Sequence, residues 1–332
     1  ITLDGYRTTR LLRASGSTEV YEAIREHDQR KVVAKVYDLE ANEGLEARVQ
    51  HEFRLIHGLE VEGVVRALAL ERAGNQLVLI LDWYEGVNLE EYCAKRQPLP
   101  VDEFFLIALQ ITHVLRDVHA QRVIHRDLKP TNLLIEPISK QVAIADFGIS
   151  VLLESERARI HDPKVVEGTL PYVSPEQTGR TGREVDFRSD LYSLGVTFYE
   201  LLTGRRPFEA ETPLELIHAH LARRPESPQW LRPELSAALS ALVMKLLEKA
   251  PERRYQSAAG LHEDLVALQL ALDQGETLDG FVLARHDVPS TLQLPHRLYG
   301  RTRESDQLIR EFRKAAAGAT RLVVISGPSG IG

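Results

Sequence analysis

The residues best suited to chemistry lie where two short apolar runs, residues 132–135 and 142–145, each carry polar side chains at one end. Both runs have the composition of short buried strands. Asp127, Asn132 and Asp146 therefore stand at strand ends, where their side chains can converge. Carboxylate and amide oxygens suit Mg²⁺, and a carboxylate can orient an attacking hydroxyl. This set of groups indicates phosphoryl transfer from a magnesium-bound nucleotide.

The string H-R-D-L-K-P-T-N, followed by D-F-G at Asp146, resembles the signature of eukaryotic-like protein kinases. By matching position, the resemblance implies that Asp127 accepts or orients the proton of the substrate hydroxyl and that Lys129 stabilises the transferring phosphoryl group. It also implies that Asn132 and Asp146 are the Mg²⁺ ligands and that ATP is the phosphoryl donor. A lysine two residues after the aspartate is the serine/threonine form rather than the tyrosine form. Two unrelated loop tripeptides are the plain alternative, which the order and spacing of the strings disfavour.

The elements that must position these groups follow from the same resemblance. It implies a two-lobed α+β fold with a small β-rich N-lobe and a large helical C-lobe. The kinase-like region is predicted over residues 3–272, with an N-lobe over about 3–82, a hinge over 82–88 and a C-lobe over 89–272. Apolar residues at helical spacing predict a long helix over 101–121, which leads the chain into the catalytic stretch.

A strand–turn–strand pattern around R-A-S-G-S-T-E-V occupies the place of the kinase glycine-rich loop. Aligning Val20 with the valine of G-x-G-x-x-G-x-V puts Arg13, Ser15 and Thr18 at the glycine positions and leaves Gly16 as the glycine of the loop. Glycines let backbone N–H groups approach phosphates without obstruction. Ser15, Gly16, Thr18 and Val20 are therefore predicted to contact the nucleotide, but in a stiffer and poorer cradle that reduces affinity or turnover.

A β-branched strand over residues 31–37 carries Lys35 in its middle. By matching V-A-I-K, the resemblance implies that Lys35 contacts the α- and β-phosphates and that Val33 packs on the adenine face. An amphipathic helix over 44–59 is predicted next, and Glu52 falls where this helix presents a partner for Lys35. An exposed lysine and a solvated glutamate are the plain alternatives. Three nearby carboxylates also remain possible partners: Glu43, Glu46 and Glu60.

The hinge is predicted to follow an apolar strand over residues 76–81. The resemblance implies that Leu81 guards the back of the nucleotide pocket and that the backbone from Asp82 to Tyr84 reads the adenine edge. Trp83 and Tyr84 are equally explained as core or rim aromatic residues.

Further residues receive supporting roles from the resemblance. Asp190 matches the aspartate that braces the catalytic-loop backbone, and Arg254 is placed to pair with Glu176 of Y-V-S-P-E. Thr169 follows a glycine in a pair whose hydroxyl contacts the catalytic aspartate and lysine. His119 has no metal-like partner and is predicted to be structural or solvated.

The periodic pattern stops after residue 272, and Gly, Pro and polar residues predict a linker over 273–297. A second module is predicted over 298–332, with an amphipathic helix, then a strand, then G-P-S-G-I-G. Gly327 and Gly332 have the spacing of a P-loop, but the sequence stops where Lys and Ser/Thr would follow, so the phosphate cradle is incomplete. A strand ending in a glycine turn is the plain alternative.

The start of this module, Y-G-R-x-x-E, resembles the entry to an AAA-like signalling ATPase. The order of the modules resembles the N-terminal part of large bacterial multi-module signalling proteins. The resemblance implies ATPase, sensor and histidine-kinase modules as C-terminal partners within a longer chain. A sequence that begins at Ile1 fits a piece of such a protein.

Composition narrows the remaining classes. The chain has 332 residues, of which 43% are hydrophobic, enough for two domains with a buried core. A net charge of −7 without basic runs argues against a nucleic-acid partner. The single cysteine, Cys93, excludes an internal disulfide and fits a cytoplasmic, reducing compartment. No apolar run reaches about 18 residues, so no membrane segment is predicted.

The sequence therefore predicts a serine/threonine protein kinase that transfers the γ-phosphoryl group of MgATP to a protein hydroxyl in bacterial signal transduction. A nucleotide-binding, pseudokinase-like regulatory module that controls an attached ATPase or histidine-kinase assembly is the alternative. The catalytic groups favour the enzyme, and the glycine-poor loop favours the regulatory module.

Overall fold

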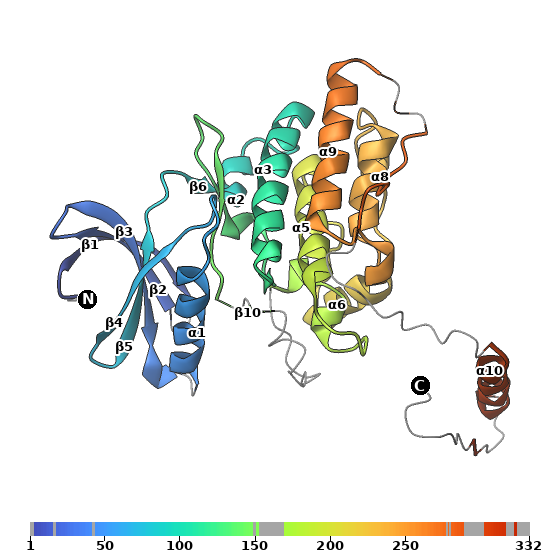
Figure 1. The fold of residues 1–332 in the computed structure, drawn as a ribbon, viewed down its shortest axis with the longest axis horizontal. Helices are drawn as coiled ribbons and strands as arrows, with labels where there is room; N and C mark the ends of the chain where they lie inside the picture. Colours follow the sequence, from blue (N-terminus) through green and yellow to red (C-terminus); the bar gives the residue numbers. More distant parts are fainter. Residues whose placement is uncertain are drawn as a thin grey trace. The chain divides into compact units, whose positions relative to one another are not determined.

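Figure 1 shows a computed structural model of the chain, which describes residues 3–15, 18–41, 44–148, 151–152, 169–276, 278, 280–288, 302–316 and 322–323. The chain divides into two units, Ile1–Val288 and Pro289–Gly332, and each is described by itself. The first unit holds both predicted lobes. None of the described helices is long and apolar enough to cross a membrane.

Five antiparallel strands form the sheet of the N-lobe, in the order β1-β2-β3-β5-β4 (Figure 1). Their bounds are β1 (Tyr6–Ser15), β2 (Thr18–Arg25), β3 (Arg30–Asp38), β4 (Ala67–Ala73) and β5 (Gln76–Asp82). β5 is apolar almost throughout because both of its faces are buried: Leu77, Leu79 and Leu81 join the main core, and Val78 and Ile80 join a smaller cluster. The predicted β-rich N-lobe is confirmed.

Helix α1 (Leu45–His57) packs against β4 and β5. Its apolar residues Val49, Leu55 and Ile56 are buried in the same core as the first face of β5. The helix therefore presents its buried polar residue, Glu52, toward the sheet. A short 3₁₀ turn, η1 (Leu39–Ala41), precedes it.

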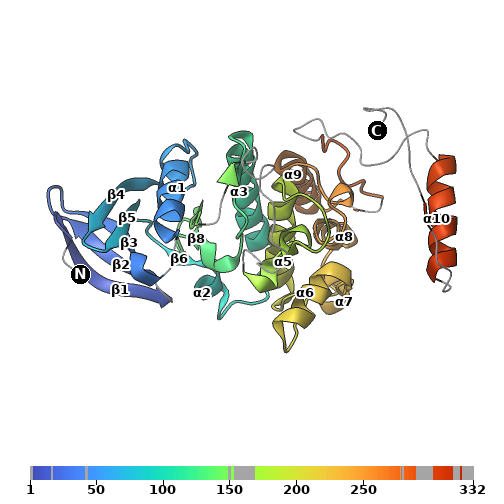
Figure 2. The ribbon, with the colours of Figure 1, turned by 90° about the horizontal axis from the view of Figure 1, so that it is seen from below.

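The C-lobe is helical, as predicted. Its described α-helices are α2 (Leu89–Cys93), α3 (Val101–Ala120), α5 (Phe187–Thr203), α6 (Pro213–Ala222), α7 (Pro228–Leu231), α8 (Ala237–Leu246) and α9 (Ala258–Asp273). Figure 2 shows α3, α5, α8 and α9 side by side, and α3 packs against both α5 and α9. Buried apolar residues from these helices form one continuous core.

Short strands and 3₁₀ turns on the C-lobe carry the predicted catalytic stretch. β6 (Val87–Asn88), β8 (Leu133–Ile135) and β9 (Val142–Ile144) form a small sheet, and β7 (Val123–Ile124) pairs with β10 (Val151–Leu152). The 3₁₀ turns are η2 (Pro130–Asn132), η3 (Leu170–Tyr172), η4 (Glu176–Thr178) and η5 (Pro251–Arg253). β8 and β9 match the two apolar runs that the sequence assigns to buried strands.

Local sequence explains where the C-lobe helices begin and end. The Asp186 carboxylate accepts a hydrogen bond from the backbone N–H of Arg188 at 2.9 Å and caps α5. Gly204 ends α5 with a φ of 74°, in the left-handed region that glycine adopts without strain. Thr212 and Glu215 form a reciprocal capping box at the start of α6.

The first half of the predicted linker is docked on the C-lobe. Phe281, Leu283 and Ala284 pack against the main core. The Asp287 carboxylate accepts hydrogen bonds from the Ser257 hydroxyl at 2.8 Å and from a backbone N–H just before α9. The first unit accordingly extends to Val288, beyond the boundary at residue 272 that the helical pattern indicates.

The second unit contains helix α10 (Thr302–Ala316), which confirms the predicted amphipathic helix. Leu322 and Val323, described from the predicted strand, lie in no strand. Gly327 and Gly332 lie outside the described residues, so the P-loop module stays a prediction.

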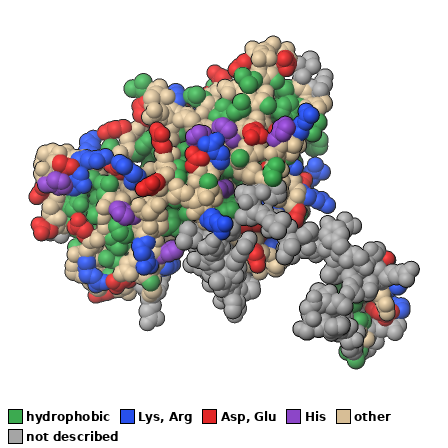
Figure 3. Space-filling view, viewed as in Figure 1, with side chains coloured by type: hydrophobic (Ala, Val, Ile, Leu, Met, Phe, Trp, Pro, Cys, Tyr) green, Lys and Arg blue, Asp and Glu red, His purple; other side chains and the backbone are tan. Residues whose placement is uncertain are grey.

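Acidic and basic side chains are interspersed over the face of the first unit that Figure 3 shows. Charged side chains of this unit also form ion pairs, such as Arg25 with Asp28 at 2.5 Å and Arg30 with Asp82 at 2.8 Å. Charges of neither sign gather into one continuous area on this face.

Candidate active site

Lys35 of β3 lies between two carboxylates. Its Nζ atom lies 3.1 Å from Oε1 of Glu52 on α1 and 2.8 Å from Oδ1 of Asp146. Of the other possible partners, Glu46 pairs with Arg72, and Glu43 lies outside the described residues. Glu52 is thus the glutamate that the fold brings to Lys35.

Lys35 and Asp146 hold each other in their charged forms. Burial alone lowers the pKa of Lys35, but the carboxylates of Asp146 and Glu52 outweigh burial and raise this pKa well above its ordinary value. Lys35 in turn holds the pKa of Asp146 below its usual range, against the opposing effect of burial. A fixed positive charge therefore stands beside an ionised carboxylate at neutral pH.

Asp127 is held through both of its carboxylate oxygens. Lys129 Nζ donates to Oδ2 of Asp127 and also to the hydroxyl of Thr169. Asn132 Nδ2 donates to the same Oδ2 at 3.1 Å, and the backbone N–H of Thr169 donates to Oδ1 at 3.1 Å. The loop and the chain after residue 168 thus meet at this carboxylate. The Thr169 hydroxyl contacts Lys129 as predicted, whereas the contact with Asp127 comes from the backbone N–H and not from the hydroxyl.

A buried aspartate of α5 supports the catalytic loop from below. Asp190 accepts hydrogen bonds from the backbone N–H groups of His125 and Arg126, at 2.9 and 2.7 Å, and lies 2.9 Å from Nε2 of His119. Burial raises the pKa of Asp190, but the bond with His119 and the other donors outweigh it and lower this pKa. The hydrogen bonds to the ionised carboxylate stabilise the backbone conformation of residues 125 and 126, which includes a φ of 70° at Arg126.

The strand after the loop ends in a strained residue. Asp146 has a φ of 64°, in the left-handed region that costs free energy for residues other than glycine. Phe147 next to it is buried, with its ring centroid 4.5 Å from that of His125. His125 also lies 3.1 Å from the Ala145 carbonyl oxygen through Nε2. His125 thus packs beneath the site, in agreement with a supporting role.

The predicted nucleotide-contacting residues follow the strand register. Val20 of β2 lies opposite Lys35 of β3, and Val33 of β3 lies opposite Leu81 of β5. Because side chains alternate along a strand, Val33 and Lys35 share one face of β3. Thr18 begins β2, paired with Ser15 at the end of β1. The Ser15 side chain and Gly16 lie outside the described residues.

The side chains of the predicted hinge are bound to other parts of the protein. The Asp82 carboxylate pairs with Arg30 at 2.8 Å and with Arg66 at 2.9 Å, and the backbone N–H of Asp82 donates to the Arg66 carbonyl. The Tyr84 hydroxyl donates to the Gln141 carbonyl at 2.7 Å. The side chains of Asp82 and Tyr84 and the N–H of Asp82 are therefore engaged within the protein, and the remaining backbone groups of residues 82–84 are the ones left for the adenine edge.

Gly86 explains how closely the hinge approaches the C-lobe. A Cβ atom at this position would lie 2.3 Å from the carbonyl oxygen of Ile135 on β8. Any other residue would force the hinge away from the small sheet that carries the catalytic stretch.

The family model for the protein kinase domain matches residues 6–266. The chain belongs to the protein kinase family.

Curated relatives of this kinase support that assignment. The serine/threonine-protein kinase pkn2 of Myxococcus xanthus is 37% identical over 280 residues, which cover 82% of this chain and 33% of the relative. The serine/threonine-protein kinase PknB of Mycobacterium tuberculosis is 32% identical over 269 residues, covering 79% of this chain and 42% of the relative. The hybrid signal transduction histidine kinase G of Dictyostelium discoideum is 29% identical, covering 72% of this chain and 9% of the relative. The chain thus spans less than half the length of each.

The end of the kinase activation segment is tied to the C-lobe by a buried ion pair. Arg254 contacts Glu176 through two hydrogen bonds of 2.7 and 2.9 Å, and the Ser189 hydroxyl donates to the same carboxylate at 2.7 Å. Burial raises the pKa of Glu176, but Arg254 outweighs burial and lowers it. The pairing that the resemblance implies is present.

Two residues that the sequence analysis did not assign to the kinase site touch its predicted members. His119 contacts Asp190, as described, and Tyr37 donates a hydrogen bond to Glu52. Their positions carried a signal: His119 lies at the buried end of the long helix, and Tyr37 lies two residues after Lys35 on the same strand face.

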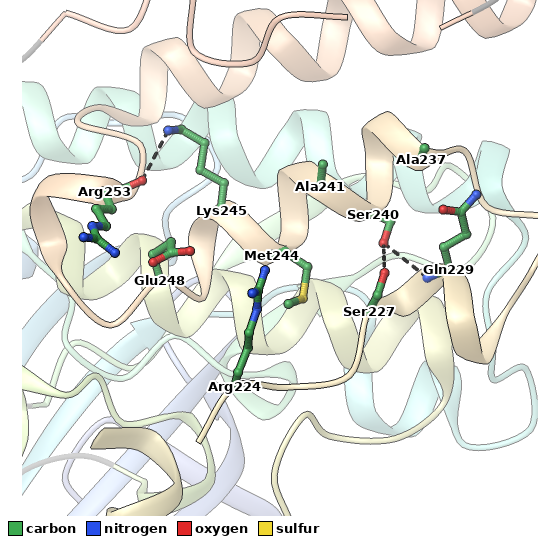
Figure 4. A pocket seen from close by; sticks show the side chains of 10 residues that line it. All are labelled: Arg224, Ser227, Gln229, Ala237, Ser240, Ala241, Met244, Lys245, Glu248 and Arg253. Atoms are coloured by element: carbon green, nitrogen blue, oxygen red, sulfur yellow. Dashed lines mark hydrogen bonds between the residues drawn. The ribbon is translucent and has the colours of Figure 1, made fainter. Parts of the chain in front are cut away.

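A separate pocket of about 460 Å³ lies in the C-lobe around α7 and α8 (Figure 4). Lys245 Nζ donates to the Arg253 carbonyl at 3.2 Å on one side, and the Ser227 and Ser240 hydroxyls lie 2.8 Å apart on the other. The apolar side chains of Ala241 and Met244 lie between these two ends, and Ala237 lines the pocket beyond Ser240. None of the predicted site residues lines it.

Proposed function

We propose that this kinase domain transfers the γ-phosphoryl group of MgATP to a serine or threonine hydroxyl of a protein. The observation that carries the proposal is the arrangement at Asp127, whose carboxylate is bound by Lys129, Asn132 and the backbone of Thr169. A carboxylate held in one orientation suits the positioning of a substrate hydroxyl. The relatives named as serine/threonine kinases support the choice of acceptor.

Each residue then has a distinct role. Asp127 orients the attacking hydroxyl and accepts its proton, and Lys129 stabilises the charge of the phosphoryl group as it transfers. Lys35, positioned by Glu52, binds the α- and β-phosphates. Val20, Val33 and Leu81 enclose the adenine ring.

Ser15, Gly16 and Thr18 are the residues proposed to contact the phosphates. Ser15 and Thr18 are small hydroxyl residues, so they can donate hydrogen bonds to phosphate oxygens. The replacement of glycines by these residues is expected to reduce nucleotide affinity or turnover rather than abolish it.

Asn132 and Asp146 fit the requirements of Mg²⁺. Lys35 binds Oδ1 of Asp146, and Asn132 donates its Nδ2 hydrogens to Asp127, so each residue keeps an oxygen that can face a cation. Mg²⁺ takes oxygen ligands, and it usually keeps several waters and substrate phosphates, so two protein ligands suffice. When bound, the ion neutralises charge that develops between the β- and γ-phosphates.

A purely regulatory, nucleotide-binding module is less well supported. The glycine-poor turn favours this alternative. A module that transfers no phosphoryl group, however, has no need for Lys129 and Thr169 beside Asp127.

We further propose that the kinase acts in cytoplasmic signal transduction as a module of a longer chain with ATPase and sensor modules. The hybrid signal transduction histidine kinase among its relatives supports a multi-module setting. Sequencing the gene beyond the codon for Gly332 tests this proposal. A coding sequence that continues without an ATPase-like segment would contradict it. Cell fractionation tests the compartment.

The activity is tested by γ-phosphoryl transfer from labelled MgATP to the protein itself and to a generic protein acceptor. Asp127→Ala and Lys35→Ala should each reduce transfer by at least about 100-fold, since each removes a group that acts in the transition state. Direct titration of MgATP accompanies the assay. A chain that binds MgATP but transfers no phosphate would favour the regulatory alternative.

A further inference from the structure

Tyr37 stands beside the Lys35–Glu52 pair and touches both of its members. The Tyr37 hydroxyl donates to Oε2 of Glu52 at 2.8 Å, while Lys35 donates to Oε1 of the same carboxylate at 3.1 Å. Lys35 Nζ also lies 5.3 Å from the centroid of the Tyr37 ring. Each carboxylate oxygen therefore has its own donor, and the two donors come from one strand.

The hydrogen bond from Tyr37 to Glu52 is important because both residues are buried. Tyr37 is 5% exposed and Glu52 is 3% exposed, so water cannot replace the tyrosine hydroxyl easily. A Cβ atom at Gly148 would lie 3.4 Å from Oε2 of Glu52, so the D-F-G backbone also passes close to this oxygen. Within the described residues, Tyr37 donates the hydrogen bond that Oε2 of Glu52 accepts.

Lys35 by itself is an imperfect anchor for Glu52. Its ammonium is shared with Asp146, which lies closer at 2.8 Å, and the proposed function gives the same ammonium to the phosphates. The ammonium of Lys35 therefore divides its three hydrogens among several anions. The Tyr37 hydroxyl has a single hydrogen, which it donates to Glu52, and Tyr37 is attached to β3, which pairs with both β2 and β5.

We propose that Tyr37 is a positioning residue of the nucleotide site. Its hydroxyl holds the carboxylate of Glu52, and thereby helix α1, in the position in which Glu52 orients Lys35 toward the phosphates. The inference rests on the proposed function, since that function assigns Lys35 to the phosphates. The plain alternative is that Tyr37 is a core residue whose hydroxyl happens to find an acceptor.

The test compares the full chain with its Tyr37→Phe variant, which keeps the ring and removes the hydroxyl. The Kd for MgATP and the KM for MgATP in the transfer assay should rise about 3- to 10-fold, because fewer free molecules hold α1 in the binding-competent position. The kcat at saturating MgATP should change less than about twofold, because bound phosphates restore the order around Lys35. A residue with only a packing role would lower the unfolding temperature without this separation of KM from kcat.

Tyr21→Phe is a matched control. The Tyr21 hydroxyl donates to Oε2 of Glu19 at 2.8 Å on β2 of the same sheet, and this bond involves neither Lys35 nor Glu52. Its removal should leave the Kd for MgATP unchanged. On a Glu52→Met background, Tyr37→Phe should have no further effect, because the hydroxyl acts through Glu52.

An unchanged Kd in Tyr37→Phe overturns the inference, and so does an equal increase on the Glu52→Met background. Because Kd is measured without phosphoryl transfer, a chain that binds MgATP and transfers nothing overturns the proposed activity alone. The comparison of Kd values then still decides the role of Tyr37. A wild-type chain that does not bind MgATP overturns both.

Discussion

Thr169 contacts both residues of the proposed catalytic pair: its hydroxyl accepts a hydrogen bond from Lys129, and its backbone N–H donates to Asp127. Thr169→Val keeps the shape and the backbone bond but removes the acceptor for Lys129. The kcat for transfer should fall about 10-fold, as expected for one lost hydrogen bond to a charged group. The Kd for MgATP, measured in parallel, should stay within about twofold of wild type because the change lies on the acceptor side of the site. Equal kcat values would show that Lys129 needs no such acceptor.

Burial opposes the positive charge of Lys249, although an aromatic ring and a hydroxyl contact its ammonium group. Its Nζ atom lies 4.2 Å from the Phe208 ring centroid and donates to the Tyr192 hydroxyl at 3.2 Å. Burial, followed by the nearby Arg254, lowers the pKa of Lys249 to about 7. Above this value the folded protein loses a proton that the unfolded chain still binds, so the free energy of unfolding rises with pH until the ordinary lysine pKa is reached.

Lys249→Met should therefore flatten the dependence of stability on pH. Between about pH 8 and about pH 9.5, the variant should lack a rise of about 1.4 kcal/mol per pH unit that the wild type shows. Urea unfolding at several pH values measures both slopes. Parallel curves for the two proteins would contradict the lowered pKa.

At the level of elements, the buried pair of Arg254 and Glu176 joins η4, α5 and the segment after η5. Arg254 also donates to the backbone carbonyls of Glu248 and Arg188, at 2.7 and 2.9 Å. Such a pair adds little net stability compared with an apolar pair, but one partner left alone is an uncompensated buried charge. The pair therefore fixes how these elements meet more than it strengthens the fold.

Arg254→Met should lower the free energy of unfolding by about 3–5 kcal/mol, because Glu176 stays buried without its partner. Urea unfolding measures the loss. Arg254→Met combined with Glu176→Met should cost less than the sum of the two single changes, since the second change removes the unpaired charge. Additive losses would mean that the two residues act independently.

At the level of the whole chain, the segment after α9 belongs to the kinase unit rather than to a free linker. Asp287 binds the start of α9, and the Ala284 N–H donates to the Asp264 carboxylate at 2.6 Å. Gly260 makes the approach possible, because a Cβ atom there would lie 2.7 Å from Cα of Asp287. Any module that follows is thus connected through residue 288, on the surface of the C-lobe, and not through the end of α9.

Asp287→Ala should lower the free energy of unfolding of the kinase unit by about 1–2 kcal/mol, because the Gln256 N–H and the hydroxyl of Ser257, the N-cap of α9, lose their charged acceptor. Asp273→Ala is the control, because Asp273 is exposed at the other end of the same helix. It should be neutral or slightly stabilising, since an acidic residue at a helix C-terminus opposes the helix dipole. Similar losses in both variants would contradict the docking role of Asp287.

The amino-acid sequence alone predicts the groups proposed to carry the chemistry, and it predicts the class of fold correctly. Asp127, Lys129, Asn132 and Asp146 lie within one short stretch, so the local order of loop and strand already places them together. The helices and strands followed from their periodic apolar residues, because burial of one face imposes that period.

The tertiary structure decided which partners these groups have. Helical spacing left several glutamates open for Lys35, and only the packing of α1 on the sheet selects Glu52. The contacts of Tyr37 with Glu52 and of His119 with Asp190 join residues from different elements, as does the docking of Asp287 near α9. Single polar side chains carry no periodic signal in sequence, since their partners are set by contacts between segments far apart in the chain.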